Sequence, residues 1–491
     1  CPGPVLVAWV DPIPRFQGHC CMKSLNHNHE DLFDLMHLRR GGAPRAAPGD
    51  PSEAEGAQTG IMEVLPAALM AIVNYLVFSL ALMLLARYVV DQKLFGVYSA
   101  AVAAITVAAT AATLGMEKYL LKIVPKYRAE HRMPLVRGFR RFAPLVVVVV
   151  TVLVMGVLLL VHRLSPPSSA LSTPTFLLAI WFLPAVVLVC WLVEVVTTDG
   201  AFVASIALYR IVLPILFLGG VLGLGYHYGS RHVTASQGVL VWSLSWTVVL
   251  LLLYAVSRSV RPRNEGAGDR SFKRIQWLRH STSYLTFSLL MSLVTNLGVL
   301  VLGFIPDARQ DTAIFAAAAQ LAGLIVVIST ATSRWYGPRL SACLALGDAA
   351  GQSAFLRSRQ LMMGAFALGF MAFLWFGGEW ALGLFGPKYR AGWTALVIMG
   401  VGSSFNCLHS LSPLYLLYEG RERVVPLMLG GAVVLLLGSA IPLGLLMGTT
   451  GVAIAYSGTL VLVYGVFTLF ARRDRRRMLA KQGRGDQFTW L

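Results

Sequence analysis

Long uncharged runs are the feature that most restricts how this sequence can fold. A helix that crosses the hydrocarbon core of a bilayer needs about 20 mainly apolar residues. Only 13% of the residues here are charged, whereas a soluble domain has roughly 25%. We therefore predict a membrane protein with twelve spans. These cover residues 62 to 86, 95 to 115, 142 to 162, 174 to 193, 202 to 224, 237 to 256, 282 to 304, 312 to 333, 361 to 377, 391 to 418, 424 to 445 and 451 to 471.

Each span is predicted to be an α-helix, because hydrocarbon offers no partner for backbone N–H and C=O groups. Residues 91 to 107 also resemble residues 307 to 325: when Tyr98 is aligned with Phe315, Ala100 and Ala101 fall opposite Ala317 and Ala318. A six-helix unit is thus predicted to have been duplicated. Six is an even number, so the copies are parallel repeats about an axis along the membrane normal.

The predicted fold is an all-α polytopic membrane protein with two parallel six-helix lobes around a central cavity. Such paired bundles suit alternating access, which favours a transporter over a channel or a membrane-embedded enzyme. The predicted organisation is a disordered cytoplasmic tail (1 to 61), an N-lobe (62 to 256), a basic cytoplasmic linker (257 to 281), a C-lobe (282 to 471) and a basic cytoplasmic tail (472 to 491).

The basic residues gather in alternate connections between the spans. The crowded segments are 116 to 141, 257 to 281, 334 to 360 and the C-terminal tail. Cationic loops stay on the cytoplasmic side, so both termini are predicted to be cytoplasmic. Orientation and attraction to anionic membrane lipids account for most of these charges. No nucleic-acid partner is expected despite the net charge of +18, because no basic domain with interleaved aromatic residues lies outside the spans.

Enzymatic and metal-site motifs are missing from the sequence. It contains no GxxxxGK[ST], HExxH or GxSxG pattern and no pair of carboxylates within a span. The cysteines and histidines between His19 and His29 have no standard zinc spacing. Cys190, Cys343 and Cys407 are interpreted as small apolar fillers. We expect no enzyme, no cofactor and no metal site.

Several short motifs follow one another near both ends of the predicted bundle. They are Ala86-Arg87, Phe95-Gly96-x-Tyr98, Leu114-Gly115-x-Glu117, Phe385-Gly386, Gly420-Arg421-Glu422-Arg423 and Gly451-Val452-Ala453-Ile454-Ala455. Together they resemble polysaccharide flippases of the multidrug/oligosaccharidyl-lipid/polysaccharide exporter superfamily, over about residues 62 to 471.

The resemblance implies a transporter that flips undecaprenyl-pyrophosphate-linked oligosaccharide from the inner to the outer leaflet of the bacterial cytoplasmic membrane. It would serve the biosynthesis of lipopolysaccharide or exopolysaccharide, with a glycan polymerase and glycosyltransferases of the same pathway as partners. The alternative is a cation-coupled multidrug exporter of the same superfamily. Cationic drugs need an anionic site, and the scarcity of acids within the spans therefore favours the flippase.

Polar residues inside the spans are the candidates for contacting the cargo, since such residues seldom face lipid. Arg210, in the fifth span, is a candidate for binding pyrophosphate; the alternative is an ion pair with Glu194 or Asp199. The other candidate substrate-binding residues are Asn74, Asn296, Asn406, His409, Lys118, Lys122, Arg334 and Arg339. For the asparagines the alternative is hydrogen bonding between helices, and for the lysines and the last two arginines it is the marking of topology.

Ion coupling has a weaker basis in the sequence. Flippases of this kind often carry an acid about five residues before a glycine equivalent to Gly303, and this sequence has Gly298 there. Coupling to H⁺ or Na⁺ would instead need Glu63, Glu194, Asp199 or His409.

Overall fold

The computed structural model describes the backbone of residues 51 to 481, except 90, 230 to 231, 261 to 267, 331, 334 to 335, 337 to 339, 341 to 348 and 419 to 423. Side chains are not described for residues 51 to 68, 349 to 354 and 477 to 481 either. Residues 8 to 65 belong to a separate unit. Apart from the start of α1, the description below concerns residues 66 to 481. The cysteines and histidines between His19 and His29, and Cys343, lie outside the described residues.

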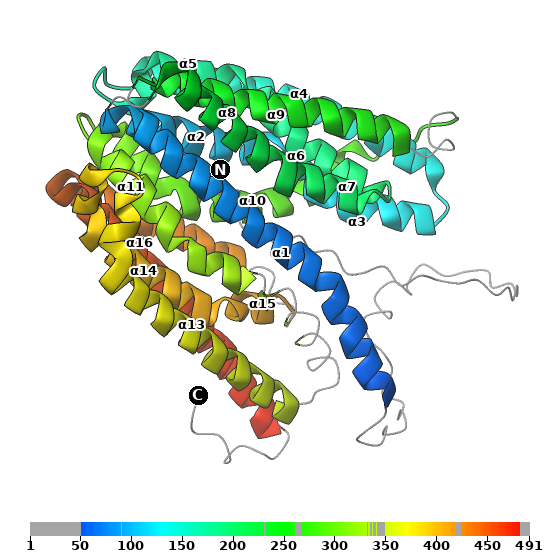
Figure 1. The fold of residues 1–491 in the computed structure, drawn as a ribbon. Helices are drawn as coiled ribbons and strands as arrows, with labels where there is room; N and C mark the ends of the chain where they lie inside the picture. Colours follow the sequence, from blue (N-terminus) through cyan, green and yellow to red (C-terminus); the bar gives the residue numbers. More distant parts are fainter. Residues whose placement is uncertain are drawn as a thin grey trace, which may run out of the picture. The chain divides into compact units, whose positions relative to one another are not determined.

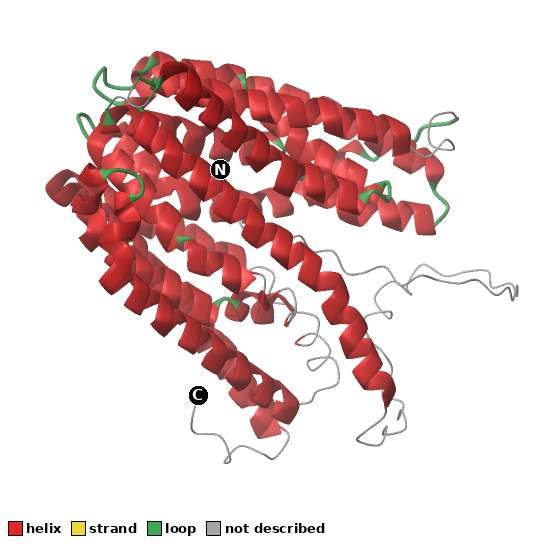
Figure 2. Ribbon diagram, viewed as in Figure 1, coloured by secondary structure: helices red, strands yellow, loops and turns green. Residues whose placement is uncertain are grey.

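The described residues are helical almost throughout (Figures 1 and 2). Strand pairing among them is limited to one isolated bridge between Val89 and Val233. The helices are α1 (Pro51–Tyr88), α2 (Gln92–Ala112), α3 (Met116–Ala129), α4 (Met133–Leu164), η1 (Ala170–Ser172), α5 (Pro174–Trp181), α6 (Leu183–Thr198), α7 (Phe202–Ala207), η2 (Leu208–Val212), α8 (Leu213–Tyr228), α9 (Ala235–Val260), α10 (Arg274–Phe304), α11 (Arg309–Ala322), α13 (Ala349–Gly383), η4 (Pro387–Gly392), α14 (Trp393–His409), α15 (Leu411–Tyr418) and α16 (Val424–Lys481).

Eleven helical segments of the described chain are long and apolar enough to cross a membrane. They are Leu69–Tyr88, Gln92–Ala129, Met133–Leu164, Pro174–Thr198, Phe202–Tyr228, Ala235–Val260, Arg274–Phe304, Arg309–Thr330, Phe355–Gly383, Pro387–Leu416 and Val424–Arg476. The last of these contains both of the final two predicted spans, which is why the count differs from twelve. Gly448 interrupts it with a non-helical backbone (φ 56°, ψ −131°).

The apolar exterior of α4 shows why these segments belong in lipid. Its exposed residues include Leu145, Val148, Val149, Val152 and Leu153, each at least half exposed. The helix buries its backbone hydrogen bonds internally, so an apolar exterior of this kind is stable in hydrocarbon. The described chain is therefore an all-helical, multi-pass membrane protein.

Several helices extend into segments that were expected to be tails or loops. Helix α1 begins at Pro51 although residues 51 to 61 were predicted to be disordered, and α10 begins at Arg274 inside the predicted linker. Helix α13 begins at Ala349, and α16 continues to Lys481. Proline is favoured in the first turn of a helix, arginine is a strong helix former, and cations are stabilising near a helix C-terminus. Segments rich in arginine, which were expected to be loops or tails, are therefore partly helical.

The two parts of the predicted duplication pack against each other through small residues. Helix α2 contacts both α10 and α11, and Figure 1 shows these helices together in the bundle. A Cβ atom added to Gly96 would lie 1.9 Å from the carbonyl oxygen of Arg309, and one added to Gly303 would lie 2.7 Å from the Cβ of Ala100. Small residues let helices approach to this distance.

Polar contacts join the N-terminal helices (α1 to α9) to the C-terminal helices (α10 to α16) at one end of the bundle. Arg87 donates from Nε to the carbonyl oxygen of Leu384 at 2.6 Å. Arg309 donates from Nη2 to the carbonyl oxygens of Pro167 and Ser169 at 3.1 and 2.9 Å. We call this the joined end, defined by Arg87, Gly96, Pro167–Ser169, Arg309 and Leu384.

The interruption at Gly448 is stabilised close to the start of α11. The carboxylate of Asp311 accepts hydrogen bonds from the backbone N–H and the hydroxyl of Thr449, at 3.3 and 2.7 Å. It thus satisfies a backbone donor at a helical restart, as an N-cap residue does. A Cβ added to Gly448 would lie 2.9 Å from the same carboxylate, so the close approach requires glycine.

Candidate functional site

Arg210 lies in a π-helical turn, η2, within the candidate span Phe202–Tyr228. In a regular α-helix its carbonyl oxygen would accept the N–H of residue 214, but that residue is proline and has no N–H. The side chain of Asn74 on α1 donates from Nδ2 to this carbonyl at 3.0 Å. Asn74 thus bonds to the backbone of η2, and single-turn π-helices of this kind are frequent at functional sites.

The two carboxylates proposed as alternative partners of Arg210 bind other cations. Asp199, whose side chain is 1% exposed, accepts from Arg128 Nη2 at 2.8 Å and also pairs with Arg140. Glu194 pairs with Lys118, and both of these side chains are largely buried. The guanidinium carbon of Arg210 lies 6.0 Å from the ring centroid of Tyr209.

Arg210 forms no ion pair with a carboxylate among the residues the structure describes. Two of the candidate coupling residues, Glu194 and Asp199, are instead neutralised by neighbouring cations. Among the sequence-predicted residues, Arg210 is therefore a cation without a carboxylate partner in the described chain, and Asn74 binds its backbone. Lys118 and Glu194 pair with each other, and Asp199 pairs with Arg128 and Arg140.

Loss of the Asp199 carboxylate is expected to destabilise the fold. In Asp199→Asn, Arg128 and Arg140 would keep their charges in a mostly buried environment and lose the carboxylate that both of them contact. Breaking a buried pair in this way lowers the free energy of unfolding by about 3 kcal/mol. Denaturation of the purified protein in mild detergent measures the change. Asp269→Asn, at an exposed position, is the matched control, and equal stability of the two variants would contradict this assignment.

Glu117, the acid of the Leu114-Gly115-x-Glu117 motif, is a buried carboxyl. It lies in the first turn of α3 beside Lys118 and is 5% exposed. Its Oε2 atom has no hydrogen-bond partner in the described part of the protein. The sequence did place Glu117 at the end of an apolar run, which was the available indication that it lies within the membrane region.

The other predicted residues do not converge on Arg210. Asn296 donates to the carbonyl oxygen of Ser292, one turn earlier on its own helix, at 2.9 Å. Asn406 is half-buried on α14, and Lys122 is exposed. Arg334, Arg339 and the side chain of Glu63 lie outside the described residues.

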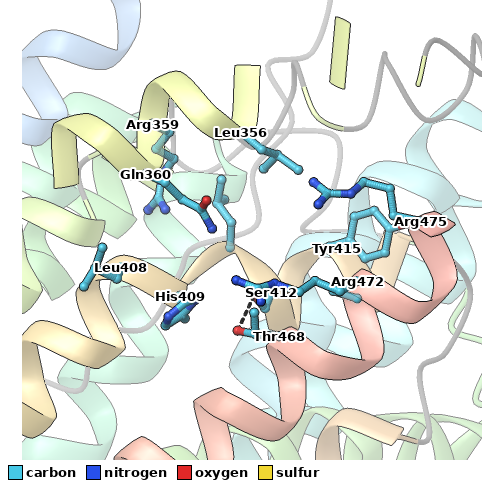
Figure 3. Close-up of a pocket in the computed structure, with 12 residues that line it drawn as sticks. Leu356, Arg359, Gln360, Leu408, His409, Ser412, Tyr415, Thr468, Arg472 and Arg475 are labelled. Atoms are coloured by element: carbon cyan, nitrogen blue, oxygen red, sulfur yellow. Dashed lines mark hydrogen bonds between the residues drawn. The ribbon is translucent and has the colours of Figure 1, made fainter. Parts of the chain in front are cut away.

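His409 belongs to a different place, a pocket built entirely by the C-terminal helices (Figure 3). Its ring lies 4.5 Å from that of Phe405, measured between centroids, and its Nδ1 atom has no partner among the described residues. The pocket is lined by Leu356, Arg359, Gln360, Leu408, His409, Leu411, Ser412, Tyr415, Thr468, Ala471, Arg472 and Arg475.

Solved structures share this fold although the sequence matches no protein-family profile and no curated protein. A structure described as the inward-facing conformation of a multidrug resistance MATE family transporter of the MOP superfamily superimposes with a TM-score of 0.65 at 14% identity, over 83% of this chain and 98% of that one. Lipid II flippase MurJ in the inward closed conformation superimposes with a TM-score of 0.59 at 13% identity, over 82% of this chain and 87% of that one. A structure of the MATE multidrug transporter DinF-BH superimposes with a TM-score of 0.54 at 14% identity, over 89% of this chain and 99% of that one.

At these identities the likeness shows the fold alone. The chain has the all-helical membrane fold shared by MATE transporters and MurJ. These three structures are of transporters and a flippase, and none is described as an enzyme. The sequence resemblance to the superfamily is confirmed at the level of the fold, without distinction between its subfamilies.

Proposed function

We propose that this protein is a transporter that flips an undecaprenyl-pyrophosphate-linked oligosaccharide from the inner to the outer leaflet of the bacterial cytoplasmic membrane. The fold supports transport, since it is shared with exporters and with a lipid II flippase. The sequence motifs between residues 86 and 117 and between 385 and 455 support the oligosaccharide cargo.

The observation that carries the proposal is the cation of Arg210 inside a span, without a carboxylate partner in the described part of the chain. An arginine at this depth costs at least about 2.5 kcal/mol unless water or an anion stabilises it. A pyrophosphate entering a hydrated cavity would supply that anion. Arginine binds phosphate oxygens with a planar fork of donors, which gives both energy and orientation.

Alternating access gives this cation a role in crossing the membrane. Unaided passage would carry the sugar and pyrophosphate through about 30 Å of hydrocarbon, where each charge costs several kcal/mol. In our proposal, α16 crosses twice with its turn at Gly448, which makes twelve spans in two six-helix lobes. The joined end then faces outward, and both termini are cytoplasmic. The lipid tail stays in the bilayer while the headgroup passes between the lobes.

A cation-coupled multidrug exporter is the second candidate. The likeness to MATE transporters favours it, and so does the buried carboxyl of Glu117, which could bind a cation or carry a proton. Glu194 and Asp199 are weaker coupling candidates because each already pairs with a cation. Arg210 favours the anionic cargo over a cationic drug.

Deletion of the gene separates the two functions. We expect intact lipid-linked oligosaccharide to accumulate in the inner leaflet and to be lost from the outer leaflet, as measured by mass spectrometry of extracted lipids together with leaflet-selective labelling. Re-expression of the full chain should restore the outer-leaflet pool. Unchanged surface glycan together with increased sensitivity to cationic dyes would instead identify a drug exporter.

A further inference from the structure

Three arginines and a histidine face one pocket in the C-terminal helices (Figure 3). Arg359 comes from α13, His409 from α14, and Arg472 and Arg475 from α16. Gln360, Ser412 and Thr468 add neutral hydrogen-bonding groups, and the hydroxyls of Ser412 and Thr468 lie 3.1 Å apart. The lining therefore combines several cations with uncharged polar groups.

No carboxylate lines the pocket among the residues the structure describes. Arg359 is 1% exposed, and its Nη2 donates to the hydroxyls of Ser333 and Ser410 at 3.1 and 2.7 Å. These acceptors are neutral, and the guanidinium carbon also lies 5.7 Å from the ring centroid of Tyr336, so its partners among the described residues include no carboxylate. The Nε of Arg359 and the Nδ1 of His409 are buried without a partner in the described chain. Buried cations are stable when paired, so the pocket favours an anionic ligand.

The depth of the pocket indicates where that ligand comes from. Arg359 is in the second turn of the candidate span Phe355–Gly383, while Arg472 and Arg475 are in the last turns of Val424–Arg476. The cations thus lie at the ends of two spans, the level at which lipid headgroups sit. Leu356, Leu408 and Leu411 add apolar side chains to the lining.

We propose that this pocket binds the phosphate of an anionic phospholipid, with Arg472 and Arg475 as its main donors. Basic pockets between spans bind lipid phosphates in this way, and arginine forks match phosphate oxygens. The apolar lining would accept the glycerol and the first acyl carbons. Leu361, which follows Gln360 on α13 and is 68% exposed, offers an adjoining surface for the chain. A free phosphate ion would make no use of these apolar groups. The site does not depend on the identity of the transported cargo.

Lipid binding to the full-length protein tests this site. Delipidated protein in neutral detergent is titrated with phosphatidylglycerol, with phosphatidylcholine of the same acyl chains, and with inorganic phosphate, and bound lipid is measured by native mass spectrometry. We expect phosphatidylglycerol to bind at least about tenfold more tightly than phosphatidylcholine, because the choline cation of phosphatidylcholine offsets the charge of its phosphate and is repelled by the arginines of the pocket. Equal affinity for the two lipids would overturn the proposal. Competition by millimolar phosphate as effective as that by the lipid would reassign the site to a free anion.

The same helix provides a matched control for charge. Arg472→Gln/Arg475→Gln removes two cations from the pocket, whereas Arg473→Gln/Arg476→Gln removes two exposed cations from the same turns. We expect the pocket variant to lose its preference for phosphatidylglycerol and the control to stay within about twofold of the parent, because diffuse surface attraction is weak and screened by salt. Equal losses in both variants would show only diffuse attraction.

A single substitution tests the same site if the double variant does not fold. Arg475→Gln alone should weaken phosphatidylglycerol binding by at least about threefold, since it removes one charged donor. Its thermal unfolding in neutral detergent without lipid should match that of Arg476→Gln. Unchanged binding in a folded Arg475→Gln protein would contradict the proposal.

Discussion

Replacement of Arg210 by glutamine is expected to slow transport of the lipid-linked oligosaccharide strongly while leaving the protein folded. Glutamine keeps hydrogen-bonding capacity but removes the charge that would meet pyrophosphate. A hydrogen bond to a charged group contributes about 1.5–3 kcal/mol, so loss of the charge should reduce the transport rate by about ten- to a hundredfold. Complementation of the deletion strain, with mass spectrometry of the outer-leaflet lipid pool, measures this rate.

Folding of the Arg210→Gln variant is expected to survive for a structural reason. Asn74 bonds to the backbone carbonyl of residue 210, which the substitution leaves in place. The charged side chain forms no ion pair with a carboxylate among the described residues, so its removal does not leave a buried acid behind.

Two further variants separate the effect of the charge at residue 210 from that of the guanidinium geometry and from that of losing any positive charge. Arg210→Lys retains the charge but lacks the planar fork, so transport should fall less than with glutamine. Arg163→Gln removes a positive charge at an exposed position of α4 and should transport like the parent. Normal transport by folded Arg210→Gln would remove the basis for an anionic cargo bound at this residue.

The membrane-spanning helices could be predicted from the sequence because their cause is local. A run of about 20 apolar residues needs only the bilayer to become a buried helix. The same local reasoning identified Arg210, since a cation inside such a run is rare. Pro214, four residues later, has no N–H to donate to the carbonyl oxygen of Arg210, so the sequence also carries the cause of the π-helical turn, although we did not predict that turn.

Contacts between distant segments could not be predicted in the same way. Asp199 pairs with Arg128 and Arg140, which lie 71 and 59 residues earlier in the chain. No periodicity joins those positions, and the acid looked equally available to Arg210. Only the packing of α6 against α3 and α4 decided between the cations.

The cationic pocket was not predicted, because whole basic segments were assigned to cytoplasmic loops and tails. Arg359, Arg472 and Arg475 fell in stretches interpreted as a cytoplasmic loop and tail, because basic residues mark that side of the membrane. Helices α13 and α16 extend into those stretches and bring the three arginines together. Topology explains on which side such residues lie, but tertiary packing determines which of them share a pocket.

Replacement of Gly96 by alanine is expected to separate α2 from α11 and to stop transport. The added Cβ would lie 1.9 Å from the carbonyl oxygen of Arg309 and 3.1 Å from the backbone nitrogen of Ala313. Backbone atoms cannot move aside as the end of a flexible side chain can, so the two helices must shift apart. A penalty of about 1.4 kcal/mol on the joined conformation would already change its population tenfold relative to one in which the helices separate.

Spin labels across the joined end measure this separation directly. Cysteines introduced at the exposed positions Lys93 and Asp307, in a background without native cysteines, place one label beside α2 and one beside α11. Gly96→Ala should lengthen or broaden their distance distribution, and the outer-leaflet lipid pool should fall in the same strain.

The control is Gly156→Ala on α4, where an added Cβ meets no atom within 4 Å. Alanine is favoured over glycine in a helix by about 0.5–1 kcal/mol, so this variant should keep the parent distance and transport normally. In the proposed alternating access one state closes the joined end and another opens it, and the close approach of Gly96 to Arg309 would belong to the closed state. If Gly96→Ala kept both the short distance and full transport, the contact between α2 and α11 would not belong to the transport cycle.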